Sequence, residues 1–182
     1  MSQAVAVPLE ARTEYEDPCV HRVLFVCTGN TCRSPMAAAL LNDKMRAYGT
    51  DAALGDGCTR AKPITAISAG LWPDVGAPIT ALAVTALAEA GVVATPYNDY
   101  TAHRARPVSE ELMAKADEVV AITGAHAMEL MMRFPQYAAK ITTLGVDIPD
   151  PYGGDAARYR ACLHMLCDAI DLHFVTGDRN EN

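Results

Sequence analysis

The sequence predicts an α/β fold: a single three-layer domain in which helices flank both faces of a central four-stranded parallel sheet. Short apolar runs alternate along the chain with longer runs of helix-forming residues, and this alternation is typical of a parallel sheet. A length of 182 residues fits one domain with a sizeable core. The four expected strands cover residues 22–26, 64–70, 118–122 and 140–144.

Start and stop signals frame the helices. The first helix is expected over residues 34–48, because Ser34 stands at a cap position and Pro35 follows at the first helical position. The second is expected over residues 79–90, with Gly91 as its stop. The remaining helices are expected over residues 109–116, 124–133 and 155–174.

Three segments lie outside this pattern. Residues 1–20 are interpreted as a flexible extension, because they lack the basic start and long apolar core of a signal peptide. Residues 49–63 are interpreted as a loop or local insertion, and residues 177–182 as a tail. The folded domain is therefore expected over residues 21–176, and no apolar run reaches the roughly 20 residues that cross a bilayer.

Charge and cysteine content narrow the function classes. The chain has 15 Lys and Arg against 22 Asp and Glu, a formal charge of −7, which argues against nucleic acid or a membrane surface as the main partner. The six cysteines include no pair with the spacing of a zinc site. No metal or cofactor is expected, and a reducing cytoplasm is the simplest setting.

The stretch VLFVCTGNTCRSPMA, residues 23–37, carries the chemistry. A buried strand, a turn of small residues and a helix start form an anion cradle, in which the backbone N–H groups from Thr28 to Arg33 point inward above the positive end of the helix. Arg33 adds a planar fork that pairs with phosphate oxygens. The loop lacks the Gly-Lys-Ser/Thr of a nucleotide-binding loop. A phosphate loop is therefore expected directly after the first strand.

Cys27 stands at the floor of this predicted cradle. The helix dipole, the inward N–H groups and Arg33 all favour a thiolate there, and a thiolate that faces bound phosphorus is a nucleophile. Ser34 offers its hydroxyl either to that sulfur or to the helix as a cap, and the two uses are compatible. The alternative for Cys27 is a small core residue, but the spacing Cys-x5-Arg in this context favours catalysis.

The whole pattern resembles the phosphate loop of the low-molecular-weight protein tyrosine phosphatases. The resemblance covers roughly residues 22–173 and implies a general acid in a loop before the last helix. Asp150 of DIPDPYGG matches that position; Asp147 is a second acid nearby, and a simple turn is the alternative for the Asp-Pro step. The resemblance also implies that Tyr152 and Trp72 form walls of the substrate site.

Further residues follow from the same resemblance. Asn30 suits a left-handed backbone position, and in the family this asparagine is held by a serine and a histidine, which Ser68 and His103 match. A surface histidine is the alternative for His103, and Arg104 and Arg106 beside it are interpreted as solvated charges. Cys32 matches the cysteine that forms a reversible disulfide with the nucleophile in the family.

The resemblance also bears on the substrate. Thr31 occupies a position where tyrosine-specific members usually carry a bulky aliphatic residue, and threonine there resembles the branch that hydrolyses phosphoarginine. Both phosphotyrosine and phosphoarginine on proteins remain open. The expected partners are phosphorylated proteins, with a phosphate or sulfate ion in the site. The expected substrate-binding residues are Thr28, Gly29, Asn30, Thr31, Cys32, Ser34, Trp72 and Tyr152.

Two other functions compete with a phosphatase. Arsenate reductases on the same fold share a similar loop but relay oxidation through further cysteines, and no cysteine lies between Cys58 and Cys162 here. A non-catalytic phosphate-binding or redox-sensing module would keep Arg33 while losing Cys27 or Asp150. Because both are present, the sequence favours the phosphatase.

Overall fold

The computed structural model describes residues 20–49 and 63–176. The predicted extension, apart from its last residue, most of the 49–63 segment and the 177–182 tail lie outside these ranges. The strands form one parallel sheet in the order β2-β1-β3-β4. Their bounds are β1 His21–Cys27, β2 Ile64–Gly70, β3 Glu118–Ala121 and β4 Ile141–Thr143. The predicted four-stranded parallel sheet is confirmed, with small shifts at the strand ends.

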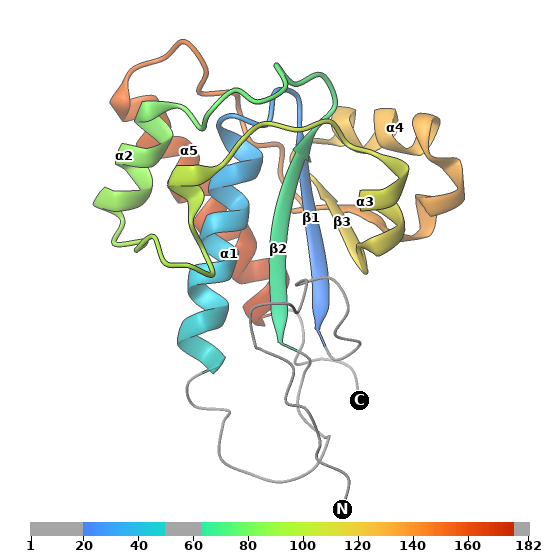
Figure 1. Cartoon of the computed structure of the whole chain (residues 1–182), viewed down its shortest axis with the longest axis horizontal. Coiled ribbons are helices and arrows are strands. Elements are labelled where there is room, and N and C mark those ends of the chain that lie inside the picture. Colours follow the sequence, from blue (N-terminus) through green and yellow to red (C-terminus); the bar gives the residue numbers. More distant parts are fainter. Residues whose placement is uncertain (1–19, 50–62, 177–182) are drawn as a thin grey trace, which may run out of the picture.

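Helices cover both faces of the sheet, as predicted. Helices α1, α2 and α5 lie on one side and α3 and α4 on the other (Figure 1). The α-helices are α1 Arg33–Gly49, α2 Ala81–Glu89, α3 Glu110–Lys115, α4 Gly124–Arg133 and α5 Ala156–Ile170. Shorter helical segments follow or connect them: η2 Tyr100–Ala102, η3 Pro135–Lys140 and η4 Asp171–Thr176.

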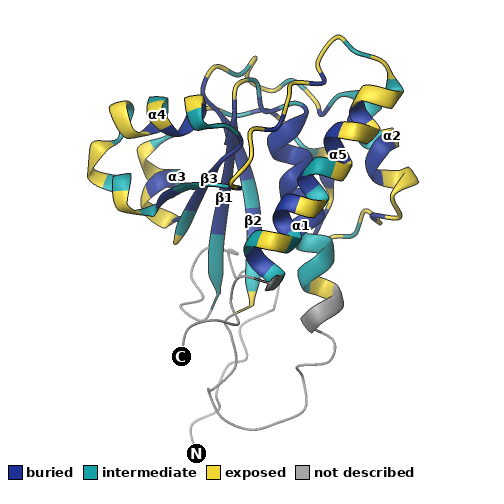
Figure 2. Cartoon of the chain, turned by 180° about the vertical axis from the view of Figure 1, so that it is seen from behind, coloured by how far each residue is buried: buried dark blue, intermediate teal, exposed yellow. Residues whose placement is uncertain are grey.

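Strand β1 occupies the centre of the sheet because every residue from Val23 to Val26 is apolar and fully buried. Its side chains alternate between the two faces, as strand geometry requires. Val23 and Phe25 join the core under α1, α2 and α5, whereas Leu24 and Val26 join the core under α3 and α4. Figure 2 shows the resulting band of buried residues through the sheet. This rigid strand delivers Cys27 to the sheet's carboxyl edge.

The start of α1 differs from the prediction. The helix begins at Arg33, and the N–H of Met36 donates to the carbonyl of Cys32 at 3.1 Å, so Cys32 rather than Ser34 holds the cap position. Pro35 lies within the first turn, where a missing N–H costs nothing. The Ser34 hydroxyl is turned toward Cys27 instead.

Side-chain caps fix the starts of three later helices. Ser109, Thr123 and Asp155 each accept a hydrogen bond from a backbone N–H three residues ahead, which satisfies a donor that has no partner within the helix. Gly91 adopts a φ of 83° just after α2, and this left-handed conformation suits glycine at a helix end. The predicted cap at Ser109 and stop at Gly91 are both confirmed.

The last predicted helix changes type before it ends. The α-helical part stops at Ile170, and a π-helical segment continues over Asp171–Thr176. Phe174 of this segment packs edge-on against Phe25 of β1, with ring centroids 6.2 Å apart. Lys44 of α1 pairs with Asp171 at 2.8 Å. The π-helical segment therefore packs against the core through Phe174. The periodicity of the sequence does not predict this change of helix type.

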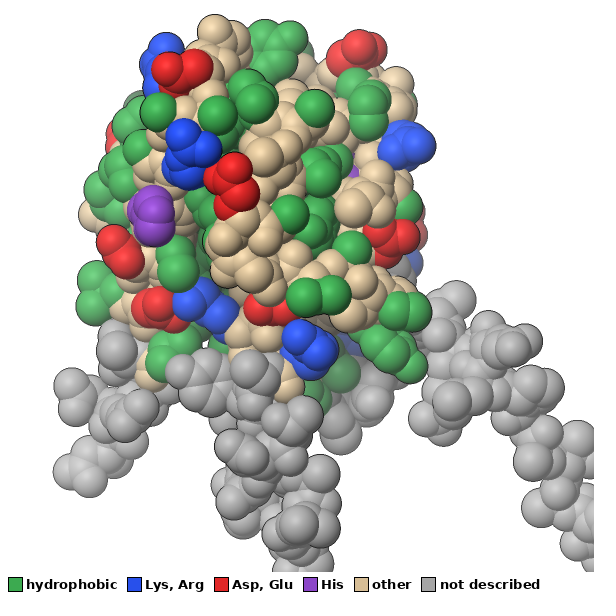
Figure 3. All heavy atoms as spheres, turned by 90° about the vertical axis from the view of Figure 1, so that its left-hand side faces the viewer, with side chains coloured by type: hydrophobic (Ala, Val, Ile, Leu, Met, Phe, Trp, Pro, Cys, Tyr) green, Lys and Arg blue, Asp and Glu red, His purple; other side chains and the backbone are tan. Residues whose placement is uncertain are grey.

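The surface over α2 and its neighbours carries acidic and basic side chains side by side (Figure 3). One such pair joins Arg160 of α5 to Glu89 of α2 at 3.2 Å. No helix in the described part of the chain has the length and apolar character needed to cross a bilayer.

A charged cluster joins three segments at the amino edge of the sheet. Glu118 at the start of β3 accepts from His173 at 2.7 Å and from Thr142 at 3.0 Å, and it lies 3.5 Å from His21 of β1. Burial by itself would raise the pKa of Glu118. The hydrogen bonds and charge of His173, with smaller contributions from Thr142 and His21, outweigh burial and hold that pKa below its usual value of 4.5.

Replacing Glu118 with glutamine is expected to lower the free energy of unfolding by about 1–2 kcal/mol near neutral pH, since hydrogen bonds to a charged group are lost. When folding lowers the pKa of a carboxyl, that carboxyl stabilises the protein at any pH above its pKa in the unfolded chain. The stabilisation is lost as the pH falls through its pKa in the folded protein. The difference in the free energy of unfolding between the wild type and Glu118→Gln, measured by urea unfolding, should therefore narrow below about pH 4.5. Glu89→Gln, at an exposed pair, is the matched control and should change the free energy of unfolding by at most about 0.5 kcal/mol. A stability difference for Glu118→Gln that does not shrink as pH falls below 4.5 would contradict the assignment.

Candidate active site

The predicted phosphate loop connects β1 to α1 at the carboxyl edge of the sheet (Figure 1). The segment after β2 runs beside it, because Leu71 and Trp72 donate backbone N–H groups to the carbonyls of Cys27 and Thr28, each at 2.9 Å. This approach requires glycine at position 70, where a Cβ atom would lie 2.8 Å from the Thr28 oxygen. The end of β2 therefore supports the loop from one side.

Cys27 lies at the floor of the loop, with only 2% of its surface exposed. Its sulfur is 3.0 Å from the Ser34 Oγ and receives the backbone N–H of Asn30 at 3.3 Å. Both contacts are hydrogen bonds that a negatively charged sulfur would strengthen. The structure thus brings the predicted nucleophile together with Ser34 at the amino end of α1.

Asn30 is fully buried and has a φ of 56°, the only positive φ of a non-glycine residue in the described ranges. Its side-chain amide donates to Ser34 at 3.0 Å and to Ser68 at 2.9 Å. The carbonyl of the same residue accepts from His103 Nε2 at 2.8 Å. Burial lowers the pKa of His103, and the nearby Arg106 adds to the effect. The structure therefore brings Ser68 and His103 together around Asn30.

Arg106 corrects the sequence interpretation. Its backbone N–H donates to the Asn30 side-chain oxygen at 3.0 Å, and its Nε donates to the Ser68 carbonyl at 3.0 Å. The side chain is therefore held against the strand that supports the loop and is not a solvated charge. Arg104 is exposed, as expected, and its guanidinium donates to the carbonyl of His103 at 2.8 Å.

Arg33 and Asp150 meet on the open side of the loop. The Arg33 side chain is 7% exposed, and its Nη2 lies 2.7 Å from Asp150 Oδ2. A second guanidinium nitrogen donates to the carbonyl of Ile148 at 3.3 Å. The backbone N–H of Tyr152 donates to the other Asp150 oxygen at 3.2 Å. The Asp150 carboxyl is half exposed beside the buried arginine.

Asp147, the other acid in this segment, has a different environment. Its Oδ1 accepts the backbone N–H of Gly124 at the first residue of α4, at 2.8 Å. The carboxylate thus stabilises the positive end of that helix. Of the two acids in the segment, Asp150 is the one that contacts the phosphate loop through Arg33.

His126 is a residue that the sequence analysis missed. It is 7% exposed in the first turn of α4, and its Nε2 lies 2.9 Å from the Oγ1 of Thr28, the first residue of the loop. The available signal was its place just after β3, since the carboxyl ends of neighbouring parallel strands share one edge of the sheet. No spacing motif links positions so far apart in the chain.

Cys32 is buried, and its sulfur contacts two hydroxyl groups from later parts of the chain. It lies 3.2 Å from the Tyr159 hydroxyl and 3.5 Å from Thr80 Oγ1. Burial, followed by the hydrogen bond to Cys32, raises the pKa of Tyr159 to about 12. Cys27 and Cys32 are both free thiols in the structure.

The remaining predicted residues lie in the loop or in the segments next to it. Gly29 and Thr31 are half buried in the loop. Trp72 is 67% exposed, and the guanidinium of Arg133 stacks 3.7 Å from its ring centroid. Tyr152 is 70% exposed. Both rings are therefore available to contact a ligand side chain at the surface.

No group of three or more His, Cys, Asp or Glu side chains within residues 20–49 and 63–176 is arranged to hold a metal ion.

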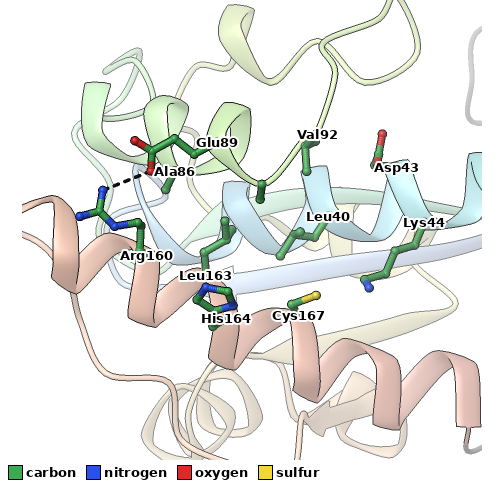
Figure 4. A pocket seen from close by; sticks show the side chains of 11 residues that line it. Leu40, Asp43, Lys44, Ala86, Glu89, Val92, Arg160, Leu163, His164 and Cys167 are labelled. Carbon is green, nitrogen blue, oxygen red and sulfur yellow. Dashed lines mark hydrogen bonds and ion pairs between the residues drawn. The ribbon is translucent and has the colours of Figure 1, made fainter.

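A separate cavity of about 380 Å³ lies between α1, α2 and α5. Figure 4 shows the Arg160–Glu89 pair at one end and Lys44 and Cys167 at the other. Its lining includes Leu40 and other residues of the three helices but none of the loop residues from Cys27 to Arg33. It is therefore distinct from the candidate active site.

Comparison with known proteins decides the family. The sequence model described as "Low molecular weight phosphotyrosine protein phosphatase" matches residues 22–176. The chain belongs to this family. A protein-arginine-phosphatase of Geobacillus stearothermophilus is 35% identical over 158 residues, which cover 83% of this chain and 92% of the relative. A probable low molecular weight protein-tyrosine-phosphatase, EpsP of Ralstonia nicotianae, is 30% identical over 156 residues, or 84% and 92% of the two chains.

Solved structures of low molecular weight phosphatases agree. The protein tyrosine phosphatase from T. tengcongensis superposes with a TM-score of 0.70 at 38% identity and covers 83% of this chain and 95% of its own. The YwlE arginine phosphatase from Geobacillus stearothermophilus gives 0.65 at 35% identity, covering 83% and 88%. The fold predicted from the sequence is therefore that of the family.

Proposed function

We propose that the protein is a phosphatase that removes phosphate from phosphorylated side chains of proteins through a cysteinyl-phosphate intermediate. In this proposal Cys27 is the nucleophile, Arg33 binds the transferring phosphoryl group and Asp150 is the general acid. The observation that carries it is the Cys27 sulfur, which lies at the floor of the loop, accepts the backbone N–H of Asn30 at 3.3 Å and lies 3.0 Å from the Ser34 hydroxyl.

The first step transfers the phosphoryl group to sulfur. The Cys27 thiolate attacks phosphorus, an S–P bond forms, and the bond from phosphorus to the leaving oxygen or nitrogen breaks. Asp150 gives its proton to the leaving atom, which departs neutral. Arg33 and the inward N–H groups of the loop stabilise the negative charge on the phosphoryl oxygens in the transition state.

The second step returns the enzyme to its starting state. A water molecule attacks phosphorus and Asp150 takes the proton that this water loses. The S–P bond breaks, and inorganic phosphate and the Cys27 thiolate are released. A thiolate only accepts hydrogen bonds, so Ser34 donates its hydroxyl hydrogen to the departing sulfur over the 3.0 Å contact and makes it a better leaving group.

Two substrate classes fit this mechanism, and relatives with both names share about a third of their residues with this chain. Thr31, half buried beside the opening, is the proposed discriminating residue. Its hydroxyl suits a polar guanidinium, whereas an aliphatic side chain packs against a tyrosine ring. On this ground we favour phosphoarginine as the better substrate. We place the enzyme's protein substrates in the cytoplasm. The free thiols of the described cysteines are consistent with a reducing compartment.

The test compares initial rates on matched phosphoarginine and phosphotyrosine peptides. The wild-type protein should release phosphate from both, and Thr31→Ile should shift the ratio of kcat/KM values about tenfold or more toward phosphotyrosine. Thr85→Ile, on the exposed face of α2, is the control and should leave the ratio unchanged. Release from neither peptide would refute the phosphatase, while an unchanged ratio in Thr31→Ile would refute only the role of Thr31.

A further inference from the structure

His126 is hydrogen-bonded at both ring nitrogens. Its Nδ1 lies 2.9 Å from the Oγ1 of Thr123, the cap of α4, and its Nε2 lies 2.9 Å from the Oγ1 of Thr28. The ring is buried, whereas Thr28 is an exposed residue of the loop. The imidazole therefore links a fixed helix terminus to the loop that is proposed to bind phosphate.

The neighbours of Thr28 favour one arrangement of the protons around the ring. Its Oγ1 also lies 3.5 Å from Nη2 of Arg33, and a guanidinium can only donate. The Thr28 oxygen accepts from Arg33, and this charged donor makes the Thr28 hydroxyl the stronger donor of the two hydroxyls that contact the ring, which favours giving its hydrogen to His126 Nε2. Thr123 Oγ1 accepts the neutral backbone N–H of His126 at 3.3 Å, and in the opposite arrangement it would donate to Nδ1. A neutral imidazole has one donor and one acceptor. With Nε2 accepting, Nδ1 carries the hydrogen and donates it to Thr123.

Charge around the ring favours the neutral form that this arrangement needs. Burial is the main cause that lowers the pKa of His126 below its usual 6.5, and the positive charge of Arg33 lowers it further. Asp150 and Asp147 act in the opposite direction with smaller effect. A neutral ring has one nitrogen that can accept from the loop, whereas a protonated ring would have none and would add a second positive charge beside Arg33.

We propose that His126 is a positioning residue, which orients the Thr28 hydroxyl so that Thr28 holds the guanidinium of Arg33 in place. The same Nη2 atom of Arg33 contacts Thr28 on one side and Asp150 on the other. His126 therefore restrains the group that the phosphatase mechanism uses to bind the phosphoryl oxygens. The inference rests on the proposed function for the role of Arg33, but its deciding readouts are phosphate binding and proton position, which need no turnover.

The first test reads the tautomer directly. In the full chain labelled with ¹⁵N, NMR of the His126 ring at pH 7.5 should show the hydrogen on Nδ1. A hydrogen on Nε2 would mean that the ring donates to Thr28, and it would overturn the proposal. This measurement uses the unmodified protein, so it stands even if a variant fails to fold.

The second test measures the dissociation constant of inorganic phosphate and kcat/KM for para-nitrophenyl phosphate. His126→Met fills the space of the ring but offers the Thr28 hydroxyl only a weak sulfur acceptor in place of a ring nitrogen. This variant should weaken phosphate binding about tenfold. His126→Gln offers an oxygen to Thr28 and should recover most of that loss. His164→Gln, an exposed histidine of α5 that lines the separate cavity (Figure 4), is the control and should bind phosphate as the wild type does. A merely structural role would lower the melting temperature of His126→Met without changing its phosphate affinity.

The third test asks whether His126 acts through Thr28. Thr28→Val removes the hydroxyl and keeps the shape, and the double variant Thr28→Val/His126→Met should bind phosphate no more weakly than Thr28→Val alone. Effects that multiply would show independent roles and overturn the proposal. If the wild type binds phosphate as described but releases none from any substrate, the proposed function fails while the positioning role stands.

Discussion

Replacing Cys27 with serine is expected to abolish phosphate release while phosphate binding persists. A serine hydroxyl stays protonated at neutral pH and is a poor nucleophile, so kcat on para-nitrophenyl phosphate should fall by at least about 10⁴-fold. The loop N–H groups and Arg33 are untouched, so calorimetry should still detect inorganic phosphate binding with an affinity within about threefold of wild type.

Cys167→Ser is the matched control, because Cys167 lies on α5 outside the loop. It should keep wild-type turnover. Cys162 on the same helix makes a further contrast: burial is the main cause that raises its pKa to about 12, so it stays a thiol at neutral pH and should not react with alkylating agents. Residual turnover in Cys27→Ser above the background of the reagents would rule out a cysteinyl-phosphate.

Asp150→Ala is expected to have the second largest effect. Loss of a general acid slows a reaction by roughly 10²–10⁴-fold when the leaving group is basic. The effect on a phosphotyrosine peptide should therefore be large, and the effect on 2,4-dinitrophenyl phosphate, which leaves readily without a proton, should be small. Comparing kcat for the two substrates separates a missing proton from general damage to the site.

The control for Asp150 is the neighbouring acid. Asp147→Asn removes a carboxyl but keeps an oxygen that accepts from Gly124, the contact that the structure gives it. This variant should retain wild-type kcat on both substrates. If Asp147→Asn were slowed on the peptide and Asp150→Ala were not, the two acids would have to exchange roles.

The elements could be predicted wherever local chemistry dictates them. The run from Val23 to Val26 is apolar at every position, and only a strand buried on both faces uses such a run in so short a segment. Its continuation into a turn and a helix start then placed Cys27 and Arg33 at the sheet edge without any tertiary information. The same reasoning identified Ser109 and Gly91, because capping depends on residues within a few positions.

The errors and omissions share another physical origin. The sequence placed Ser34 at the cap position and left open whether its hydroxyl contacts the helix or Cys27, because sequence does not rank two hydrogen bonds of similar strength. The structure puts Cys32 at the cap and the Ser34 hydroxyl beside Cys27. Arg106 was assigned to solvent, whereas it donates to the backbone oxygen of Ser68; every residue offers such an oxygen, so no side-chain pattern marks it. His126 meets Thr28 across 98 positions of the chain, a proximity that only the assembled sheet creates.

The contacts of Asn30 have a consequence for biosynthesis. Its amide oxygen is held by the backbone of Arg106, 76 positions further along the chain, and Arg33 meets Asp150 across 117 positions. A nascent polypeptide on the ribosome therefore exposes its reactive sulfur long before the surrounding amides are secured. If Arg33 and Asp150 act as proposed, we expect enzymatic competence only when nearly the whole translated domain has emerged, and we expect truncated or stalled products to be inert toward phosphorylated proteins.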